Sequence, residues 1–261
     1  MNINNIIKLN EIKRKNIDSK IKIEKAEEFF YRAYYEINQS DKIKFYTIAI
    51  KLNPQYQDAY FNRAGVYADL KQYDMAIKDL TKAIELNIED KNSYNNRAIV
   101  YYEMNDYEKA IEDYSKVIEL DPLNQNAYFN RALSYKMQDN FFMAIKDFNK
   151  AIDLNPLDEE AFYNRGIVHY IMKDYDRAIK DYSDAIEVND EYEDAYNGRG
   201  VAFYYQCQYE KAIKDYMKVI KLNPYNNEVY YNLALICKLK ECGSTIKAEC
   251  KKCGGKLCFN I

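Results

Sequence analysis

The sequence is poor in residues that break regular secondary structure: its 261 residues include only 7 glycines and 4 prolines. A fold built from many short strands needs turn residues at every connection, so this composition disfavours a sheet-rich fold. Histidine occurs once, at His169, and no glycine-rich phosphate-binding loop is present. The acidic residues are spread along the chain instead of converging on one point, so we predict a protein that is not an enzyme.

Long apolar runs are also missing. No stretch approaches the roughly 18–20 apolar residues that a membrane span requires, and Met1 to Lys8 lack the apolar core of a signal peptide. We therefore expect a cytoplasmic protein without a membrane partner. The formal net charge of −3 and the pI near 5.5 provide no overall attraction to nucleic acid or to anionic membranes, so nucleic acid is not an expected partner of the folded chain.

A strict internal repeat dominates the sequence. The segment Tyr60-Phe61-Asn62-Arg63-Ala64 recurs every 34 residues, in near-copies that begin at Tyr94, Tyr128, Phe162 and Tyr196. A period without insertions marks stacked copies of one supersecondary unit. We divide the chain into a lead-in compatible with a helix, a degenerate repeat, five full repeats, a half repeat that caps the stack, and a Cys- and Lys-rich tail: 1–22, 23–56, 57–90, 91–124, 125–158, 159–192, 193–226, 227–240 and 241–261.

Each repeat predicts two helices joined by a short turn. Apolar residues recur at helical spacing in its first half, as Tyr128, Ala132 and Tyr135 do in the third full repeat. A polar pair follows, and the second half opens with an aromatic residue and carries Ala-Ile. It ends at Leu-Asn or Leu-Asp, usually before a proline, which cannot continue a helix. Neither helix can bury its apolar stripe alone, so neighbouring helices must stack.

This pattern resembles the tetratricopeptide repeat. The initial aromatic, the small residue at Ala64 or Gly166, the tyrosine at Tyr67 or Tyr101, and the later Ala and Pro agree with it over roughly residues 23–240. The resemblance implies an all-α, right-handed superhelical solenoid of antiparallel helix pairs. It also implies a protein–protein interaction scaffold whose concave groove is lined by the first helix of each repeat.

The positions that face the groove follow from helical geometry. Counting Gln57, Lys91, Gln125, Glu159 and Glu193 as position one, positions four, eight and eleven should pack on the second helix. Positions two, five, six, nine, twelve and thirteen should then point into the groove. Position six is asparagine except at Gly198, and an amide can bond both the N–H and the C=O of an extended backbone; in the family, asparagine ladders at this position bind peptides. The predicted groove residues are Asn62, Asn96, Asn130, Asn164, Asn232, Phe61, Phe129, Tyr163, Tyr102, Tyr170 and Tyr204.

Two alternatives to this groove stay open: the asparagines bond only the neighbouring repeat, and several of the rings pack only between adjacent helices. Position two adds an acidic rim, which favours a neutral or basic partner segment: Asp58, Glu160, Asp194 and Glu228. Family members that clamp a C-terminal carboxylate use Lys and Arg at positions two, five and six. Those cations are absent here, so we do not expect such a clamp. Gly198 has no side-chain amide, so we expect the groove to bind the peptide backbone more weakly at this repeat.

Position seven is arginine in every full repeat, where the family usually has leucine, and position twenty-three is always aspartate. The two positions lie at similar distances before and after the turn, so an antiparallel hairpin brings them level. We predict a structural ion-pair ladder that fixes helix register, formed by Arg63, Arg97, Arg131, Arg165 and Arg199 with Asp79, Asp113, Asp147, Asp181 and Asp215. Half-exposed pairs would contribute only about 0–1 kcal/mol each. The alternative is an arginine row that binds an acidic ligand.

The tail gathers Cys242, Cys250, Cys253 and Cys258. Cys250-x2-Cys253-Gly resembles one zinc knuckle, so zinc, a reduced tail without fixed structure, and redox use all stay open; the repeats themselves imply no cofactor. His169 occupies position eleven, where other repeats have Tyr or Phe, and is expected in the core. Besides a scaffold, the sequence allows a zinc- or nucleic-acid-binding protein acting through the tail, or a regulatory subunit of a separate enzyme.

Overall fold

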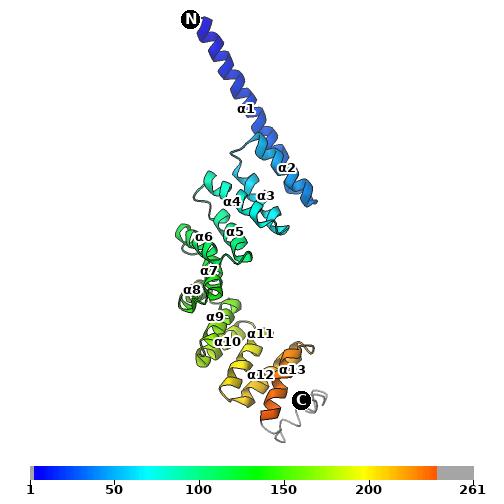
Figure 1. Ribbon diagram of the computed structural model, residues 1–261, viewed down its shortest axis with the longest axis vertical. Helices are drawn as coiled ribbons and strands as arrows, with labels where there is room; N and C mark the ends of the chain where they lie inside the picture. Colours follow the sequence, from blue (N-terminus) through cyan, green and yellow to red (C-terminus); the bar gives the residue numbers. More distant parts are fainter. Residues whose placement is uncertain (1–2, 240–261) are drawn as a thin grey trace. The chain divides into compact units, whose positions relative to one another are not determined.

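The computed structural model describes residues 3–239, with side chains described for residues 18–237. Within residues 3–239 the chain forms thirteen α-helices and no strand, which confirms the predicted all-α architecture (Figure 1). The helices are α1 Ile3–Tyr35, α2 Gln39–Leu52, α3 Gln57–Asp69, α4 Tyr73–Leu86, α5 Lys91–Glu103, α6 Tyr107–Leu120, α7 Gln125–Met137, α8 Phe141–Leu154, α9 Glu159–Ile171, α10 Tyr175–Val188, α11 Glu193–Tyr205, α12 Tyr209–Leu222 and α13 Asn227–Leu239.

The helix bounds follow the repeat. From α3 to α12 each full repeat contributes one helix that begins at position one and one that begins at the aromatic of position seventeen. The half repeat forms α13, whose Leu233 packs in one cluster with Val219 of α12. At the other end α1 shows no boundary at residue 22, so the lead-in and the first half of the degenerate repeat form a single helix.

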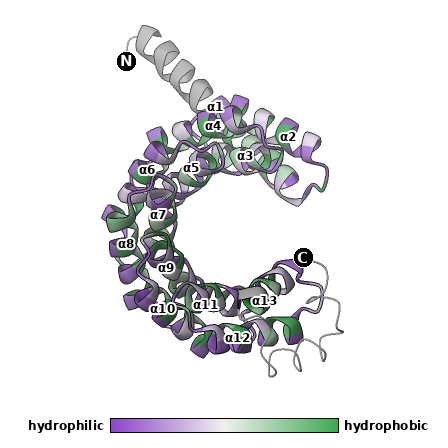
Figure 2. Cartoon of the chain, turned by 60° about the horizontal axis from the view of Figure 1, so that its bottom comes forward, coloured by the Kyte–Doolittle hydropathy of each residue, from purple (hydrophilic) through white to green (hydrophobic). Residues whose placement is uncertain are grey.

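The helices group into two compact units that divide within α7, after Ala127. In the N-terminal unit α1 packs on α2, α3 on α4 and α5 on α6, and α2 and α4 each contact the helix that follows. In the C-terminal unit the same pattern runs from α8 to α13. Figure 2 shows α3 and α5 on one side of the first unit and α9, α11 and α13 on one side of the second. We call these helices the first-helix layer and their partners the second-helix layer.

Small residues let the paired helices approach closely. Positions eight and twenty are alanine or glycine and are buried, for example Ala98 and Ala110. A large side chain from position twenty-four fills the space beside them, and each is at most 2% exposed: Leu80, Tyr114, Phe148, Tyr182 and Tyr216. Two of these rings lie against a glycine and, as placed, leave no room for a side chain there: a Cβ on Gly166 would lie 2.8 Å from Tyr182 and one on Gly200 would lie 2.6 Å from Tyr216.

The turn between the two helices of every full repeat contains a left-handed residue that is not glycine. Position fifteen has φ between 57° and 61° in Lys71, Asn105, Asp139, Lys173 and Cys207. The backbone N–H of Lys71 donates to Ala68 (2.8 Å) and that of Gln72 to Tyr67 (2.8 Å), the hydrogen-bond pair of a Schellman motif. The turn therefore supplies hydrogen-bond donors to the last carbonyl groups of the first helix, but it holds the residue at position fifteen in a strained left-handed conformation.

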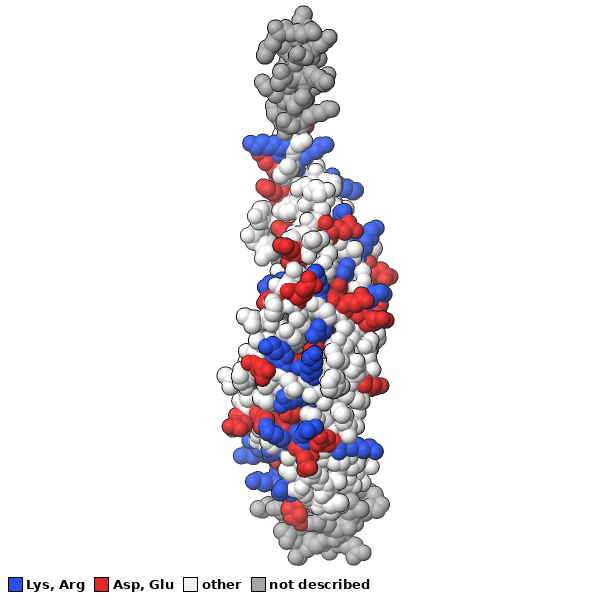
Figure 3. Space-filling model, turned by 90° about the vertical axis from the view of Figure 1, so that its left-hand side faces the viewer, with Lys and Arg blue, Asp and Glu red and all other residues white. Residues whose placement is uncertain are grey.

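The face shown in Figure 3 carries charged side chains of both signs. Acidic and basic side chains alternate in small groups over the face shown in Figure 3. None of the helices in the described part of the chain has the length and apolar character needed to cross a membrane.

The left-handed turn residue generates a stability prediction. Lys71→Gly should raise the free energy of unfolding by on the order of 0.5–1 kcal/mol, because glycine adopts φ near 57° without a steric penalty, less its greater entropy in the unfolded chain. Urea unfolding followed by circular dichroism measures this. Lys71→Ala, which removes the side chain but keeps the Cβ, is the control and should give no gain; equal stability of the two variants would refute the explanation.

Candidate functional site

The arginine of position seven forms a two-pronged ion pair with the aspartate of position twenty-three in each full repeat. Its Nε and Nη2 atoms donate to the two carboxylate oxygens at distances between 2.6 and 3.0 Å. The aspartate side chains are only 2–6% exposed and the arginines 13–19%, so the pairs are more buried than the half-exposed ladder expected from the sequence. The pairs are Arg63–Asp79, Arg97–Asp113, Arg131–Asp147, Arg165–Asp181 and Arg199–Asp215.

A further donor of the same arginine reaches the preceding repeat. Arg63 Nη1 donates to Thr47 Oγ1 at 2.8 Å and Arg97 Nη1 to Thr81 Oγ1 at 2.9 Å. Arg165 makes the equivalent bond to Asn149 at 2.7 Å, and Arg199 to Ser183 at 2.9 Å. Each acceptor stands at position twenty-five. The guanidinium therefore joins both helices of its own repeat to the second helix of the preceding one. Sequence reasoning missed this contact, although position twenty-five is a small polar residue wherever the next repeat has the arginine.

The ends of the array replace this polar link with apolar contacts. In the degenerate repeat, positions seven and twenty-three are Phe29 and Phe45, whose ring centres lie 6.2 Å apart. In the half repeat, position seven is Leu233, and the residue at position twenty-five before it is Met217; the two belong to one apolar cluster. Where the arginine is missing, one of its partners is missing as well: the aspartate in the degenerate repeat, and the small polar acceptor before the half repeat.

At least one aromatic ring lies beside each of these arginines, and two lie beside Arg63, Arg97 and Arg131. The guanidinium carbon of Arg97 lies 5.7 Å from the ring centre of Tyr94 and 6.0 Å from that of Tyr101, at positions four and eleven. Hydrogen bonds from Arg97 to Asp113 raise the pKa of the guanidinium, an effect that burial opposes and the charge of Asp113 adds to. A charge that is paired, hydrogen-bonded and stacked in this way is suited to holding helices in register.

Three of the predicted groove residues line one cleft in the N-terminal unit. The cleft has a volume of about 430 Å³ and is bordered by Phe61, Asn62 and Asn96, together with residues of α1, α2 and α3 that the sequence analysis did not select. The latter include Tyr34, Lys42, Tyr46 and Val66. Asn62 donates through Nδ2 to the backbone oxygen of Asp58 at 2.8 Å, which orients its amide.

In the C-terminal unit the predicted groove side chains have partners within the array. The ring of Phe129 packs on Phe148 with centres 5.8 Å apart, and that of Tyr163 on Tyr182 at 5.7 Å. Asn164 donates to the backbone oxygen of Glu160 at 2.9 Å and accepts from Lys136 Nζ at 2.8 Å. Asn130 and Asn232 are half-buried on the same layer. Contacts within the array therefore account for part of this surface.

The tyrosines of position twelve also pack within their own repeat. Each lies against the aromatic of position seventeen that opens the second helix, with ring centres 5.3–5.9 Å apart. The pairs are Tyr102–Tyr107, Tyr170–Tyr175 and Tyr204–Tyr209. These rings close the end of the helix pair and present only part of their surface to solvent.

Lys136 is a polar residue of this surface that sequence reasoning missed. It stands at position twelve, where three other repeats have tyrosine, and burial lowers the pKa of its ammonium group. Its Nζ bonds the Asn164 amide. The signal in the sequence was the replacement of an aromatic by a cation at one position of the repeat.

Gly198, which stands in place of the asparagine of position six, lies close to a buried ring. A Cβ on Gly198 would lie 2.9 Å from the Tyr182 ring, and that ring is only 2% exposed. The same tyrosine crowds Gly166. A tyrosine at position twenty-four does not by itself exclude the asparagine, because the unit after Tyr216 keeps Asn232.

The single histidine lies in the core slot expected for it. His169 is 7% exposed, and its Nε2 lies 3.7 Å from Asp181 Oδ2. Burial lowers the pKa of the imidazole; Asp181 and Asp174 oppose this, while Arg165 and Arg177 add to it. The tail cysteines proposed as zinc ligands (Cys242, Cys250, Cys253 and Cys258) lie outside the described residues. Cys237, which is described, is buried in α13.

A sequence profile described as "Tetratricopeptide repeat" matches residues 58–90, 92–124, 159–192 and 193–226, and a second profile of that description matches 125–158. The chain belongs to the tetratricopeptide repeat family. Members of this family are typically non-catalytic scaffolds that bind other proteins or peptides. No curated protein sequence matches the chain.

Solved tetratricopeptide repeat structures share the fold at low sequence identity. One, from Parabacteroides merdae ATCC 43184, is 20% identical with a TM-score of 0.69, covering 91% of this chain and 94% of its own. The MamA protein is 23% identical with a TM-score of 0.61, covering 66% and 94%. YrrB, described as "a TPR protein with an unusual peptide-binding site", is 21% identical with a TM-score of 0.60, covering 75% and 97%.

The buried ion pair predicts how the array responds when it is broken. Arg97→Phe should lower the free energy of unfolding by on the order of 3 kcal/mol, because it leaves Asp113 buried without a counterion. Arg97→Phe/Asp113→Phe, which copies the Phe29–Phe45 pair of the degenerate repeat, should recover at least half of that loss. Urea unfolding of the three proteins checks this; a double variant no more stable than the single one would contradict it.

His169 predicts a pH-dependent stability. Its pKa is lowered in the folded chain, so the unfolded chain binds the proton first as pH falls below about 6.5, and stability is lost from that pH downward. The melting temperature of the unaltered chain should therefore fall more between pH 7.5 and pH 5.5 than that of His169→Phe. Thermal unfolding in phosphate-free buffer measures both, and parallel curves for the two proteins would contradict the prediction.

Proposed function

We propose that the chain is a non-catalytic scaffold that binds an extended peptide segment of a partner protein along its first-helix layer. The observation that supports this most directly is the cleft of about 430 Å³ in the N-terminal unit, where Phe61, Asn62 and Asn96 meet Tyr34 and Tyr46. Amides supply donors and acceptors for a backbone, and tyrosines provide contact area with little rotamer entropy to lose.

The orientation of the amides suits this role. The bond from Asn62 Nδ2 to its own helix leaves Oδ1 directed away from that bond, as an acceptor for a backbone N–H. Lys42 and Asp69 border the same cleft, and they can bond polar side chains of a partner. Family membership and the peptide-binding site described for YrrB agree with a peptide ligand.

The first-helix layer of the C-terminal unit belongs to the proposed surface and has an acidic character. Burial raises the pKa of Asp194, as do the charges of Glu193 and Glu228. Burial also raises the pKa of Tyr163 to about 12, with contributions from Asp194 and Glu228. A basic side chain of the partner would relieve this concentration of negative charge, so the proposed segment is neutral or basic. The proposal includes the cytoplasmic location expected from the sequence.

The groove can be tested without knowing the natural partner. Linear peptides selected on the full chain from a displayed random library should bind Asn62→Ala/Asn96→Ala about tenfold more weakly, because two backbone hydrogen bonds of about 0.5–1.5 kcal/mol each are lost. Fluorescence anisotropy gives the affinities. Lys78→Ala, an exposed change on α4 outside the cleft, is the control and should bind normally.

The melting temperature distinguishes binding from folding. The double variant should unfold at nearly the same temperature as the unaltered chain, since Asn62 bonds only its own helix backbone. Full peptide affinity combined with a lowered melting temperature would show that the asparagines serve the fold alone, and it would refute the proposed groove.

A further inference from the structure

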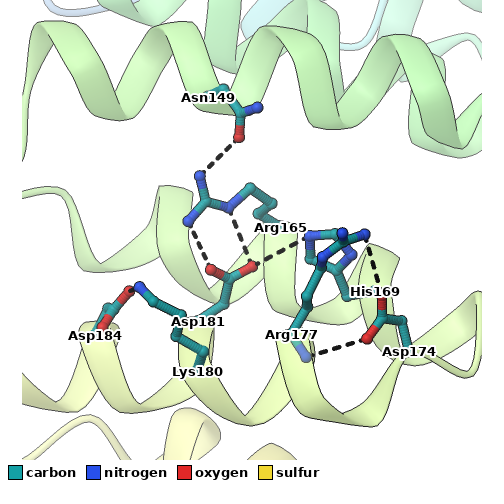
Figure 4. A network of polar contacts seen from close by, with 8 residues as sticks. All are labelled: Asn149, Arg165, His169, Asp174, Arg177, Lys180, Asp181 and Asp184. Carbon is teal, nitrogen blue, oxygen red and sulfur yellow. Dashed lines mark hydrogen bonds and ion pairs between the residues drawn. The ribbon is translucent and has the colours of Figure 1, made fainter.

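A second cleft lies in the C-terminal unit, among residues that the proposed groove does not use. It has a volume of about 450 Å³ and is lined by α8, α9 and α10 (Figure 4). Small-molecule sites commonly have volumes of roughly 300–1,000 Å³. The lining residues are Ile145, Asn149, Arg165, His169, Arg177, Lys180 and Asp181.

The cleft occurs where His169 departs from the repeat. The other full repeats have Tyr67, Tyr101, Tyr135 and Phe203 at this position. In two of them a lysine from position nineteen covers the ring: Lys109 Nζ lies 5.3 Å from the centre of Tyr101, and Lys211 Nζ lies 5.2 Å from that of Phe203. The imidazole of His169 is smaller than these rings and fills less of the slot. Position nineteen is Arg177 here, and it pairs with Asp174 at 3.2 Å.

His169 brings a buried polar atom into this cleft. The residue is 7% exposed, and its Nδ1 has no hydrogen-bond partner among the described residues. A neutral imidazole carries one donor and one acceptor nitrogen. The carboxylate of Asp181, 3.7 Å from Nε2, favours the hydrogen on that nitrogen, so Nδ1 is an acceptor that lacks a donor. A buried acceptor without a partner destabilises the fold, and a ligand with a hydrogen-bond donor would offset that loss.

The cleft also presents positive charge that can turn toward a ligand. Three cations and one carboxylate line it, and Arg165 is already bonded to that carboxylate, Asp181. Arg177 and Lys180 are 73% and 72% exposed and pair only with Asp174 and Asp184 of the neighbouring turns. Exposed ion pairs at this helical spacing are weak. An anion in the cleft can therefore compete for both cations.

We propose that this cleft binds a phosphate group, with Arg177 and Lys180 on its charged oxygens and its remaining P–OH donating to His169 Nδ1. Inorganic phosphate is an anion that keeps at least one P–OH through neutral pH, and a phosphate monoester keeps its P–OH below its second pKa of about 6. Sulfate and carboxylates are ionised without a proton to donate. The site therefore requires both features of phosphate. The phosphate comes from a free small molecule or from a phosphorylated side chain, and the experiment separates the two.

The test uses the full chain without a histidine tag, because His169 is then the one histidine and its imidazole gives a single set of NMR signals. Titration with inorganic phosphate at pH 6.5 should shift these signals saturably, and calorimetry should give the affinity. Sulfate should bind at least tenfold more weakly than phosphate. Equal affinity for the two anions, or a His169 signal that does not move, would overturn the proposal.

Matched variants identify the residues. His169→Phe, which restores the ring of the fifth repeat, and Arg177→Ala/Lys180→Ala should each reduce phosphate affinity at least tenfold. Lys211→Ala/Lys214→Ala changes the same two positions in the fifth repeat, where Phe203 occupies the slot, and should leave it unchanged. All three change one slot or exposed side chains, and melting temperatures confirm that they fold. If Arg177→Ala/Lys180→Ala and Lys211→Ala/Lys214→Ala lost phosphate affinity equally, the binding would depend on nonspecific positive charge, and the proposed site would be overturned.

Two further arms define the ligand. Affinity for a phosphoserine peptide should fall between pH 6 and pH 8, because a phosphate monoester loses its last P–OH hydrogen above its second pKa of about 6, whereas inorganic phosphate retains one P–OH over this range. The charged groups facing His169 are Arg165 on α9, Asp181, Arg177 and Lys180 on α10, and Asp174 in the turn, while α8 contributes Ile145 and Asn149 to the lining. Peptide affinity that rises with pH would overturn the hydrogen-bond assignment. At pH 6, a phosphoserine peptide that binds more tightly than inorganic phosphate would identify a phosphorylated side chain as the source, and weaker binding would identify a free small molecule.

Discussion

The arginine at position seven donates to a carboxylate of its own repeat and to a hydroxyl or amide of the preceding one, so a single planar group connects three helices. Burying such a charge is not in itself a source of stability, because the desolvation of both partners is costly. It does impose geometry, since the fork of a guanidinium fits a carboxylate in few orientations. The link therefore sets how the two helices of a repeat align and how the next repeat sits on them. Phe29 with Phe45 at one end, and Met217 with Leu233 at the other, show that apolar side chains occupy these positions once an aspartate or a polar acceptor is missing.

Stacked repeats contact only their neighbours, so every interface must be specified locally. The constant residues do this: small side chains at positions eight and twenty, a large one at twenty-four, and the arginine link. Changes at these positions compensate one another across the helix pair. Tyr182 is accommodated by Gly166 on its own repeat and by Gly198 on the next, where an additional Cβ would lie within 3 Å of the ring. Position six of the fifth repeat therefore lies against a ring that, as placed, leaves no room for a Cβ.

The regular part of this molecule could be read from the sequence because it depends on spacing. The period predicted the paired helices and their ends, and the equal distances from the turn brought Arg63 level with Asp79. The contacts that individual side chains make could not be predicted in the same way. Helical geometry predicted that Phe129 and Tyr163 face the groove, but it could not show that their rings rest on Phe148 and Tyr182. The left-handed residue of the turn was also hidden, since Lys, Asn, Asp and Cys occupy it and glycine never does.

Because the repeats share one structure, the residue at any position can be compared with its equivalents in the other repeats. A substitution at a position that is otherwise constant then shows what that repeat has gained or lost. At position eleven of the other full repeats stands a phenyl or phenol ring, and in the second and fifth repeats a lysine from position nineteen lies on its face. His169 leaves the slot partly open, keeps a buried acceptor without a donor and leaves Arg177 to the solvent side. Each change would weaken a purely structural repeat, and together they assemble an acceptor and two cations around one cleft. The proposed peptide groove arises differently, from residues that the framework leaves free to vary. Because Arg165 contributes to the cleft while holding Asp181 and Asn149, a ligand bound there would act directly on the link between the third and fourth repeats.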